Sequence, residues 1–158
     1  MAAMPNVLQM TRVLTSRPIL PTVAGVTLRT FAGPSDIEPW LRLRARAFEA
    51  ESPQVRDWTA ADFDREFRSK AWWRPEAMWI AEEVQTVGSV ILARRREAQP
   101  AVSWLMVDPE DRRRGIGRLL LGTLEASVWD QGIRQVWLET HANWQSVAFY
   151  RAAGYVDC

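Results

Sequence analysis

The residues with the clearest capacity for chemistry lie in the stretch 104–120, where an apolar run leads into an arginine triplet and two glycines. Residues 105–107 read as the end of a strand, and the apolar spacing after Gly115 is typical of a helix. The first N–H groups of a helix lack partners within it, and glycines let a backbone approach a phosphate closely. The pattern Arg112-x-x-Gly115-x-Gly117 therefore predicts a pyrophosphate cradle, although an arginine-rich turn can also be only a solvated face.

The elements around this stretch predict a mixed α/β domain. An antiparallel meander is the simplest arrangement of the three central strands, and the connection from Val107 to Val136 should be a right-handed parallel crossover. Capping patterns at Ser35–Glu38 and Thr59–Asp62 indicate two helix starts, and Ser52-Pro53 the end of the first helix. The expected strands are 26–31, 78–82, 87–93, 101–107 and 135–140, and the expected helices are 35–51, one from Thr59, 116–131 and 146–153.

Composition excludes several classes of protein. The chain has 158 residues, a formal net charge of +1 and 47% hydrophobic residues, which fits one folded domain and gives no general attraction for nucleic acid. One Cys and one His make a zinc site implausible, so no metal is expected. No apolar run reaches the ~20 residues of a membrane span. We expect an N-terminal arm over 1–25 and the domain over 26–158.

Two segments of the sequence resemble motifs of the GCN5-related N-acetyltransferase (GNAT) family: the one that contains Gly115 and Gly117, and another closer to the C-terminus. Arg112-x-x-Gly115-x-Gly117 after residues 105–109 is similar to the acetyl-CoA-binding motif of that family. The segment 138–140, with Asn143 and the run 149–155, resembles the second family element. The resemblance covers about residues 26–156 and implies a GNAT-like mixed central sheet with helices on both faces, acetyl-CoA as co-substrate, and transfer of an acetyl group to an amine.

The same resemblance implies roles for individual residues. The Leu105 N–H polarises the acetyl carbonyl and stabilises the charge that develops on its oxygen, and Tyr150 protonates the leaving thiolate as general acid. Asn143 hydrogen-bonds the pantetheine arm, and side chains of Arg112 or Arg114 contact phosphate. The remaining cofactor-binding positions are backbone groups of Leu105, Met106, Val107, Arg113, Arg114, Gly115, Ile116, Gly117 and Arg118.

Two departures from the family pattern bear on these roles. The span from Leu138 to Asn143 is one residue shorter, and Ser146 stands where Ala is usual. The sequence also stops at Cys158, so the two C-terminal strands of the family are missing or replaced. Three alternatives remain: a truncated chain, a strand from a neighbouring chain, or a strand from residues 7–14. An open sheet edge would favour pairing into a homodimer.

The general base and the acceptor are the least determined parts of the site. The strand 101–104 carries no carboxylate, where the family often has a Glu, so the candidate bases are Glu139, His141, Glu51 and Asp57. The acceptor region of the family lies in the first two helices. Here that region contains rings that either form an acceptor rim or pack on the sheet, namely Phe48, Trp58, Phe63, Phe67, Trp72 and Trp73.

These observations favour an acetyl-CoA-dependent N-acetyltransferase that acts on a small-molecule or peptide amine by direct attack in a ternary complex. A cysteine acyl-enzyme is disfavoured because Cys158 lies at the end of the chain. The alternative is a non-catalytic acyl-CoA-binding module of the same fold. We expect no nucleic-acid or membrane partner and a cytoplasmic location. The first 25 residues lack a signal-peptide core, and a transit-type leader is the alternative for them.

Overall fold

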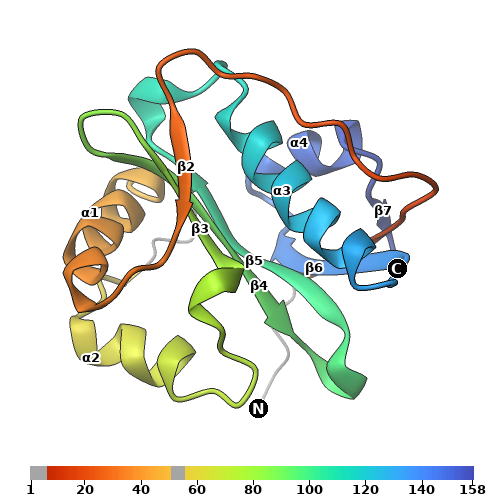
Figure 1. The fold of residues 1–158 in the computed structure, drawn as a ribbon, viewed down its shortest axis with the longest axis horizontal. Helices are drawn as coiled ribbons and strands as arrows, with labels where there is room; N and C mark the ends of the chain where they lie inside the picture. The colour runs from red at the N-terminus through yellow and green to blue at the C-terminus, as the bar shows by residue number, and fades with distance from the viewer. Residues whose placement is uncertain (1–6, 51–55) are drawn as a thin grey trace.

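A seven-stranded mixed sheet runs between two layers of helices in the computed structural model, which describes residues 7–50 and 56–158 (Figure 1). Strands β5 and β6 are parallel, and the other neighbouring strands are antiparallel. In spatial order the strands are β2 (Thr27–Thr30), β3 (Met78–Glu82), β4 (Thr86–Arg94), β5 (Pro100–Val107), β6 (Gln135–His141), β1 (Val7–Val13) and β7 (Val156–Asp157). The predicted antiparallel meander and parallel crossover are therefore confirmed.

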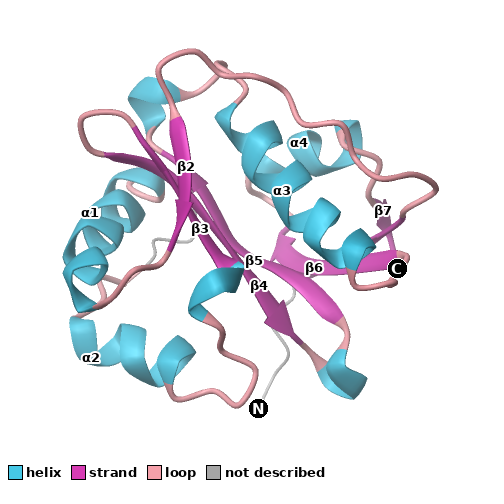
Figure 2. Ribbon diagram, viewed as in Figure 1, coloured by secondary structure: helices cyan, strands magenta, loops and turns pink. Residues whose placement is uncertain are grey.

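Helices cover both faces of the sheet, as predicted (Figure 2). The longer helices are α1 (Ile37–Ala47), α2 (Ala60–Phe63), which continues as a π-helical turn over Asp64–Arg68, α3 (Ile116–Asp130) and α4 (Ser146–Ala152). Short 3-10 turns occupy Pro34–Asp36, Pro75–Ala77, Arg96–Ala98 and Pro109–Asp111. One apolar cluster fills the space between the sheet and α3 with α4, and a second, rich in aromatic rings, lies beneath α1 and α2.

The two predicted helix caps have different outcomes. At α2 the Thr59 hydroxyl accepts from the Asp62 N–H while the Asp62 carboxylate accepts from the Thr59 N–H, so this capping box is confirmed. At α1 the prediction of Ser35 as the cap is wrong. The residue before this helix is Asp36, whose carboxylate is bound by Arg29 and by the Ala32 N–H instead. The predicted end of this helix, Ser52-Pro53, lies outside the described residues.

The N-terminal segment contributes a strand to the sheet. Residues 7–13 of the predicted arm form β1, which pairs with β6 from Val7↔His141 to Val13↔Gln135. In this structure the strand beside β6 is therefore formed by residues 7–13. On its other side β1 pairs with the short β7, whose Val156 lies opposite Thr11.

A buried ion pair connects β1 to α3. Arg12 Nη1 donates to Glu125 Oε1 at 2.9 Å, and the Tyr155 hydroxyl donates to Glu125 Oε2 at 2.8 Å. Glu125 is only 2% exposed, so both of its oxygens depend on these two donors. A second link between the N-terminal segment and α3, Arg17 with Asp130, is exposed on both sides.

The central strands separate where the site forms. β5 and β6 pair at Ala101↔Trp137 and Val102↔Leu138. Among the described residues, the pairing between these two strands does not continue beyond Val102. On its other side β5 carries a bulge, because the register with β4 passes from Ser89↔Met106 to Ile91↔Ser103. Bulges re-aim side chains and backbone groups next to functional sites. Trp104, one of the two β5 residues that lie opposite the single Val90 of β4, has the left-handed φ of 52°, which is strained for a bulky side chain.

Candidate active site

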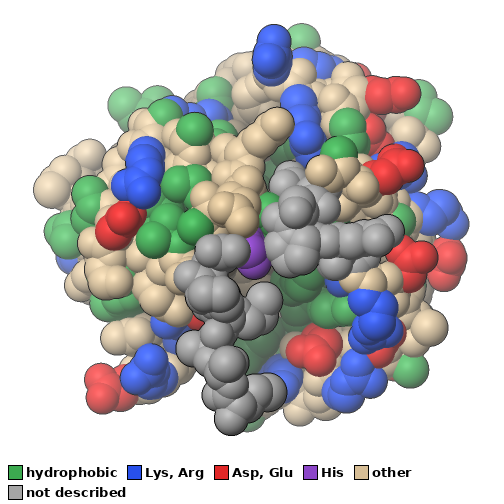
Figure 3. Space-filling view, turned by 180° about the vertical axis from the view of Figure 1, so that it is seen from behind, with side chains coloured by type: hydrophobic (Ala, Val, Ile, Leu, Met, Phe, Trp, Pro, Cys, Tyr) green, Lys and Arg blue, Asp and Glu red, His purple; other side chains and the backbone are tan. Residues whose placement is uncertain are grey.

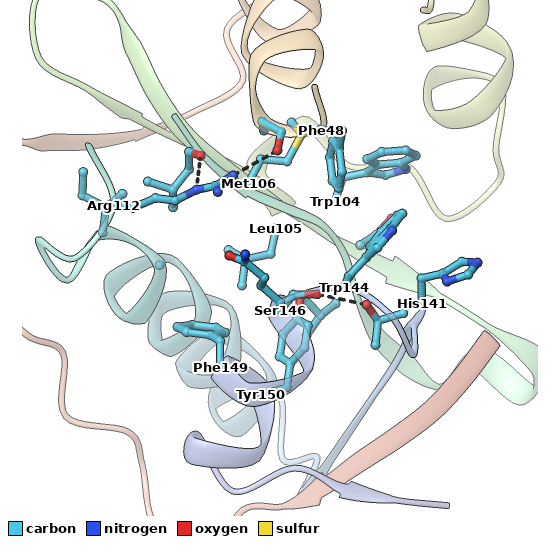
Figure 4. A pocket seen from close by; sticks show the side chains of 18 of the residues that line it. Phe48, Trp104, Leu105, Met106, Arg112, His141, Trp144, Ser146, Phe149 and Tyr150 are labelled. Atoms are coloured by element: carbon cyan, nitrogen blue, oxygen red, sulfur yellow. Dashed lines mark hydrogen bonds between the residues drawn. The ribbon is translucent and has the colours of Figure 1, made fainter. Parts of the chain in front are cut away.

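A pocket of about 870 Å³ opens where β5 and β6 separate. Its walls come from the end of α1, from β5, from the loop at the start of α3, from β6 and from α4. In the close-up, Phe48 and Trp104 lie on one side of Leu105, and Phe149 and Tyr150 project from α4 on the other (Figure 4). The pocket therefore brings the two sequence motifs to one place.

Two glycines shape the loop that lines the pocket at the start of α3. Gly115 has φ of +91° and is the residue before α3, a conformation that L side chains rarely adopt. A Cβ on Gly117 would lie 3.3 Å from the Phe149 ring, so glycine lets the helix start close to α4. The free N–H groups of the first turn of α3 border the pocket, and the helix dipole adds partial positive charge there.

Most predicted site residues line this pocket. Those that do are Leu105, Met106, Val107, Arg112, Arg113, Gly115, Ile116, Gly117, Arg118 and Tyr150. Arg114 and Asn143 are not among the lining residues. Arg114 binds Glu83 and Asp111, which raises the pKa of its guanidinium and lowers that of Glu83. Asn143 is exposed in the turn before α4.

Arg112 lines the pocket while tying α1 to β5. Its Nη2 donates to the Ala47 carbonyl at 2.9 Å and its Nε to the Val107 carbonyl at 3.4 Å (Figure 4). A second link runs in parallel, because Arg46 Nε donates to the buried Asp108 carboxylate at 2.6 Å. These links hold the end of α1, and with it Phe48, against the strand that leads into the glycine loop.

An aromatic wall closes one side of the pocket, and we define it as Phe48, Trp104 and Trp144. The Phe48 ring lies 5.5 Å from Trp104 and 5.1 Å from Trp144, centroid to centroid. Sequence reasoning singled out Phe48 but missed Trp144, whose position next to Asn143 was the available signal. The other rings proposed for an acceptor rim pack in the cluster beneath α1 and α2, namely Trp58, Phe63, Phe67, Trp72 and Trp73.

Tyr150 is a buried phenol on the wall of the pocket. It is 6% exposed, and burial raises the pKa of its hydroxyl above the ordinary value of 10.0. The hydroxyl therefore stays protonated at neutral pH. Ser146, one turn earlier on α4, shares a hydrogen bond of 3.2 Å with Thr140 on β6, which fixes the start of this helix against the strand.

Two of the four candidate bases reach the pocket. Glu139 and His141 both line it, and the one His, in purple in Figure 3, is recessed on that face of the molecule. His141 is stacked on Trp144 at 5.5 Å. Asp57 is exposed and is not a lining residue, and Glu51 lies outside the described residues.

Burial of the two tyrosines predicts how stability changes at alkaline pH. The pKa of Tyr150 and of Tyr155 is raised above 10.0 in the folded chain, chiefly by desolvation. Below pH 10 both phenols are neutral in the folded and unfolded chain. Above it only the unfolded chain loses these protons, so the free energy of unfolding should fall by about 1.4 kcal/mol per pH unit for each tyrosine. Urea unfolding between pH 8 and 11 measures this slope, and Tyr155→Phe should show a clearly smaller one. Equal slopes in the wild type and in Tyr155→Phe would contradict the raised pKa of Tyr155 in the folded chain.

Comparison with known proteins identifies the family. Residues 38–155 match the acetyltransferase (GNAT) family. This chain belongs to that family. The resemblance predicted from the two motifs is thus confirmed, and so is the GNAT fold with its mixed sheet between helices.

Curated relatives of this GNAT chain are named mycothiol acetyltransferase. The protein from Thermobispora bispora is 36% identical over 139 residues, which are 83% of this chain and 46% of the relative. The protein from Mycolicibacterium smegmatis is 35% identical over 119 residues, or 73% of this chain and 39% of the relative. This GNAT chain thus spans about half the length of the curated relatives it matches.

Solved GNAT structures share the fold. A GCN5-related N-acetyltransferase from Sphaerobacter thermophilus superposes with a TM-score of 0.78 at 23% identity, covering 96% of this chain and 48% of that one. A GNAT acetyltransferase from Staphylococcus aureus has a TM-score of 0.64 at 17% identity and covers 81% of each chain. Among the described residues, the helices of this GNAT chain are too short or too polar to cross a bilayer.

Proposed function

We propose that this chain is an acetyl-CoA-dependent N-acetyltransferase that acetylates an amine of a small molecule or peptide by direct attack in a ternary complex. The observation that carries the proposal is one continuous pocket with the left-handed Gly115 turn at one end, the bulged Leu105 between, and Tyr150 on its wall. The acceptor of the mycothiol acetyltransferases enters as a candidate, because relatives of that name are 31–36% identical.

The residues of the pocket fit the cofactor. Free N–H groups at the start of α3, with Arg113 and Arg118 nearby, suit a pyrophosphate. The separated edge of β5 offers backbone groups of Leu105, Met106 and Val107 to a pantetheine arm. When bound, acetyl-CoA supplies a thioester whose carbonyl carbon accepts the amine. In this proposal the Arg112 side chain holds α1 against β5 rather than contacting phosphate, since its guanidinium already binds two backbone carbonyls.

The chain's own groups then divide the work. The Leu105 N–H donates to the carbonyl oxygen as negative charge develops on it. The amine nitrogen forms a bond to the carbonyl carbon, the carbon–sulfur bond breaks, and Tyr150 gives its proton to the sulfur. Glu139 or His141 takes the amine proton through water. The hydrogen bond from Asn143 to the pantetheine arm remains a prediction. So do a cytoplasmic location, the absence of nucleic-acid and membrane partners, and formation of a homodimer.

Substitution of Gly115 tests the cofactor part of the proposal. Gly115→Ala should weaken CoA binding about tenfold or more, because the new Cβ opposes the left-handed turn that presents the N–H groups. Gly132→Ala is the matched control, since Gly132 also has a positive φ, 80°, but is not a lining residue of the pocket. Calorimetric titration with CoA measures both. An equal loss in the two variants would mean that only general stability was changed.

An acceptor screen tests the transfer itself. Release of free CoA thiol is followed with acetyl-CoA and a panel of alkylamines, amino sugars, amino acids and peptides with free N-termini. Thiol release with at least one amine supports the enzyme. Tight CoA binding with no thiol release across the panel would favour a non-catalytic acyl-CoA-binding module.

A further inference from the structure

Arg44 on α1 is a buried cation directly behind the aromatic wall. It is 3% exposed, and its guanidinium carbon lies 4.8 Å from the centroid of Trp104 and 4.1 Å from that of Trp58. Trp104 lines the pocket, whereas Arg44 does not. The indole of Trp104 therefore separates this guanidinium from the space where an acceptor amine approaches Leu105.

Within residues 7–50 and 56–158, the charge of Arg44 contacts indole rings and a backbone carbonyl but no carboxylate. Its Nη1 donates to the Arg56 carbonyl at 2.7 Å, and its Nε has no hydrogen-bond partner within the described part of the chain. The charged side chains around it are Arg56, Asp57 and Asp62. Asp62 is already bound by Arg56 and Arg65, and no carboxylate of residues 7–50 or 56–158 forms an ion pair with Arg44. Desolvation lowers the pKa of this guanidinium to about 10, so it stays charged at neutral pH.

A fixed positive charge in this position matters because an amine attacks a thioester only in its neutral form. The β5 segment 101–104 carries no carboxylate that would attract an ammonium to the bulge. We propose that Arg44 acts through Trp104 as an electrostatic positioning residue, which makes the acceptor end of the pocket select the neutral amine over the ammonium. This inference rests on the proposed function and concerns the acceptor, not the cofactor.

The expected size of the effect follows from Coulomb's law. An acceptor nitrogen in contact with the pocket side of Trp104 lies roughly 8 Å from the guanidinium, given the 4.8 Å between Arg44 and the ring centroid. With an effective dielectric constant of ~20, a cation at that distance lowers the pKa of a bound ammonium by about one and a half units. Selection for the neutral form should therefore change about thirtyfold when the charge is removed.

The test uses two probes of nearly the same shape. 2-Phenylethylamine is an ammonium ion at neutral pH, and O-benzylhydroxylamine, which has oxygen in place of one methylene, is neutral. Their dissociation constants are measured by calorimetry at pH 7 on the full chain saturated with CoA. The variants are Arg44→Met, which removes the charge but keeps the length, Arg44→Lys, which keeps a charge, and Arg42→Met. Arg42 lies on the same helix with its side chain 59% exposed, so Arg42→Met is the matched control for a lost surface charge.

The wild type should bind the neutral probe more tightly, and Arg44→Met should reduce that preference about thirtyfold. Arg44→Lys should retain most of the preference, and Arg42→Met all of it. A preference unchanged in Arg44→Met, with CoA binding intact, would overturn the proposal and leave Arg44 as packing between two indoles. Failure of both probes to bind the wild type would also count against it. Failure of the wild type to bind CoA would instead contradict the proposed function.

Discussion

Tyr150→Phe is expected to lower turnover about 100-fold or more while leaving the affinity for acetyl-CoA nearly unchanged. Loss of a positioned general acid costs about 10²–10⁴ in rate. The ring of Tyr150 packs against Phe149 and Tyr155 at centroid distances of 5.5 and 5.7 Å, and Phe preserves these contacts. Removal of the hydroxyl therefore changes the proposed proton donor and leaves the ring packing in place. Steady-state kinetics with saturating acceptor, together with calorimetry for the cofactor, separates the two quantities.

The neighbouring aromatic residue supplies the control for this prediction. Phe149→Leu changes a lining side chain on the same helix but removes no hydroxyl, so its effect should fall on cofactor binding, because Phe149 packs against Gly117. Unchanged turnover in Tyr150→Phe would show that Tyr150 only packs in the core. Another group would then have to protonate the thiolate.

Glu125→Ala is expected to destabilise the fold by about 3 kcal/mol, the largest effect on stability that we predict. The substitution leaves Arg12 without its carboxylate and the buried Tyr155 hydroxyl without its acceptor. Breaking one side of a buried pair typically costs 3–5 kcal/mol, and the partial exposure of Arg12, 33% for its side chain, places the value at the lower end. Urea unfolding at pH 7 measures the change.

The exposed pair on the same helix is the matched control. Asp130→Asn removes the carboxylate that Arg17 binds, but both side chains are more than half exposed. Its cost should be clearly smaller, because solvent screens an exposed ion pair. Glu125→Gln should fall between the two, because its carbonyl oxygen can still accept from Tyr155. Equal losses for Glu125→Ala and Asp130→Asn would refute the importance assigned to the buried network.

The parts of the fold that local chemistry determines were predictable. The Thr59–Asp62 capping box, the helix after Gly115 and the strands on either side of it were all predicted from spacing. The pocket follows from these elements, because the end of β5 and the start of α3 are adjacent in the sequence. The cap at α1 was mispredicted because Arg29, seven residues before Asp36, binds the carboxylate that begins the helix.

The features that the sequence did not reveal depend on contacts between distant residues. A strand from residues 7–14 was one of three alternatives, and the sequence could not select it, since the partner of Val13 in β6 is the distant Gln135. The same holds for Arg112, whose triplet suggested phosphate binding but whose guanidinium meets a carbonyl at the end of α1. Nothing in the sequence around Arg44 indicates that its guanidinium lies between Trp58 and Trp104, because both rings are distant in the sequence.

The place of β1 in the sheet has a consequence for how the chain folds. β1 precedes the other strands of the sheet in the sequence, yet its neighbours β6 and β7 come last among them. Until residues 135–141 have left the ribosome, β1 cannot form its pairing with β6. Contacts of such high sequence separation slow folding. This half of the sheet should therefore form last, after the meander β3–β4–β5 has assembled, and a nascent chain stalled before Gln135 should leave β1 open to protease.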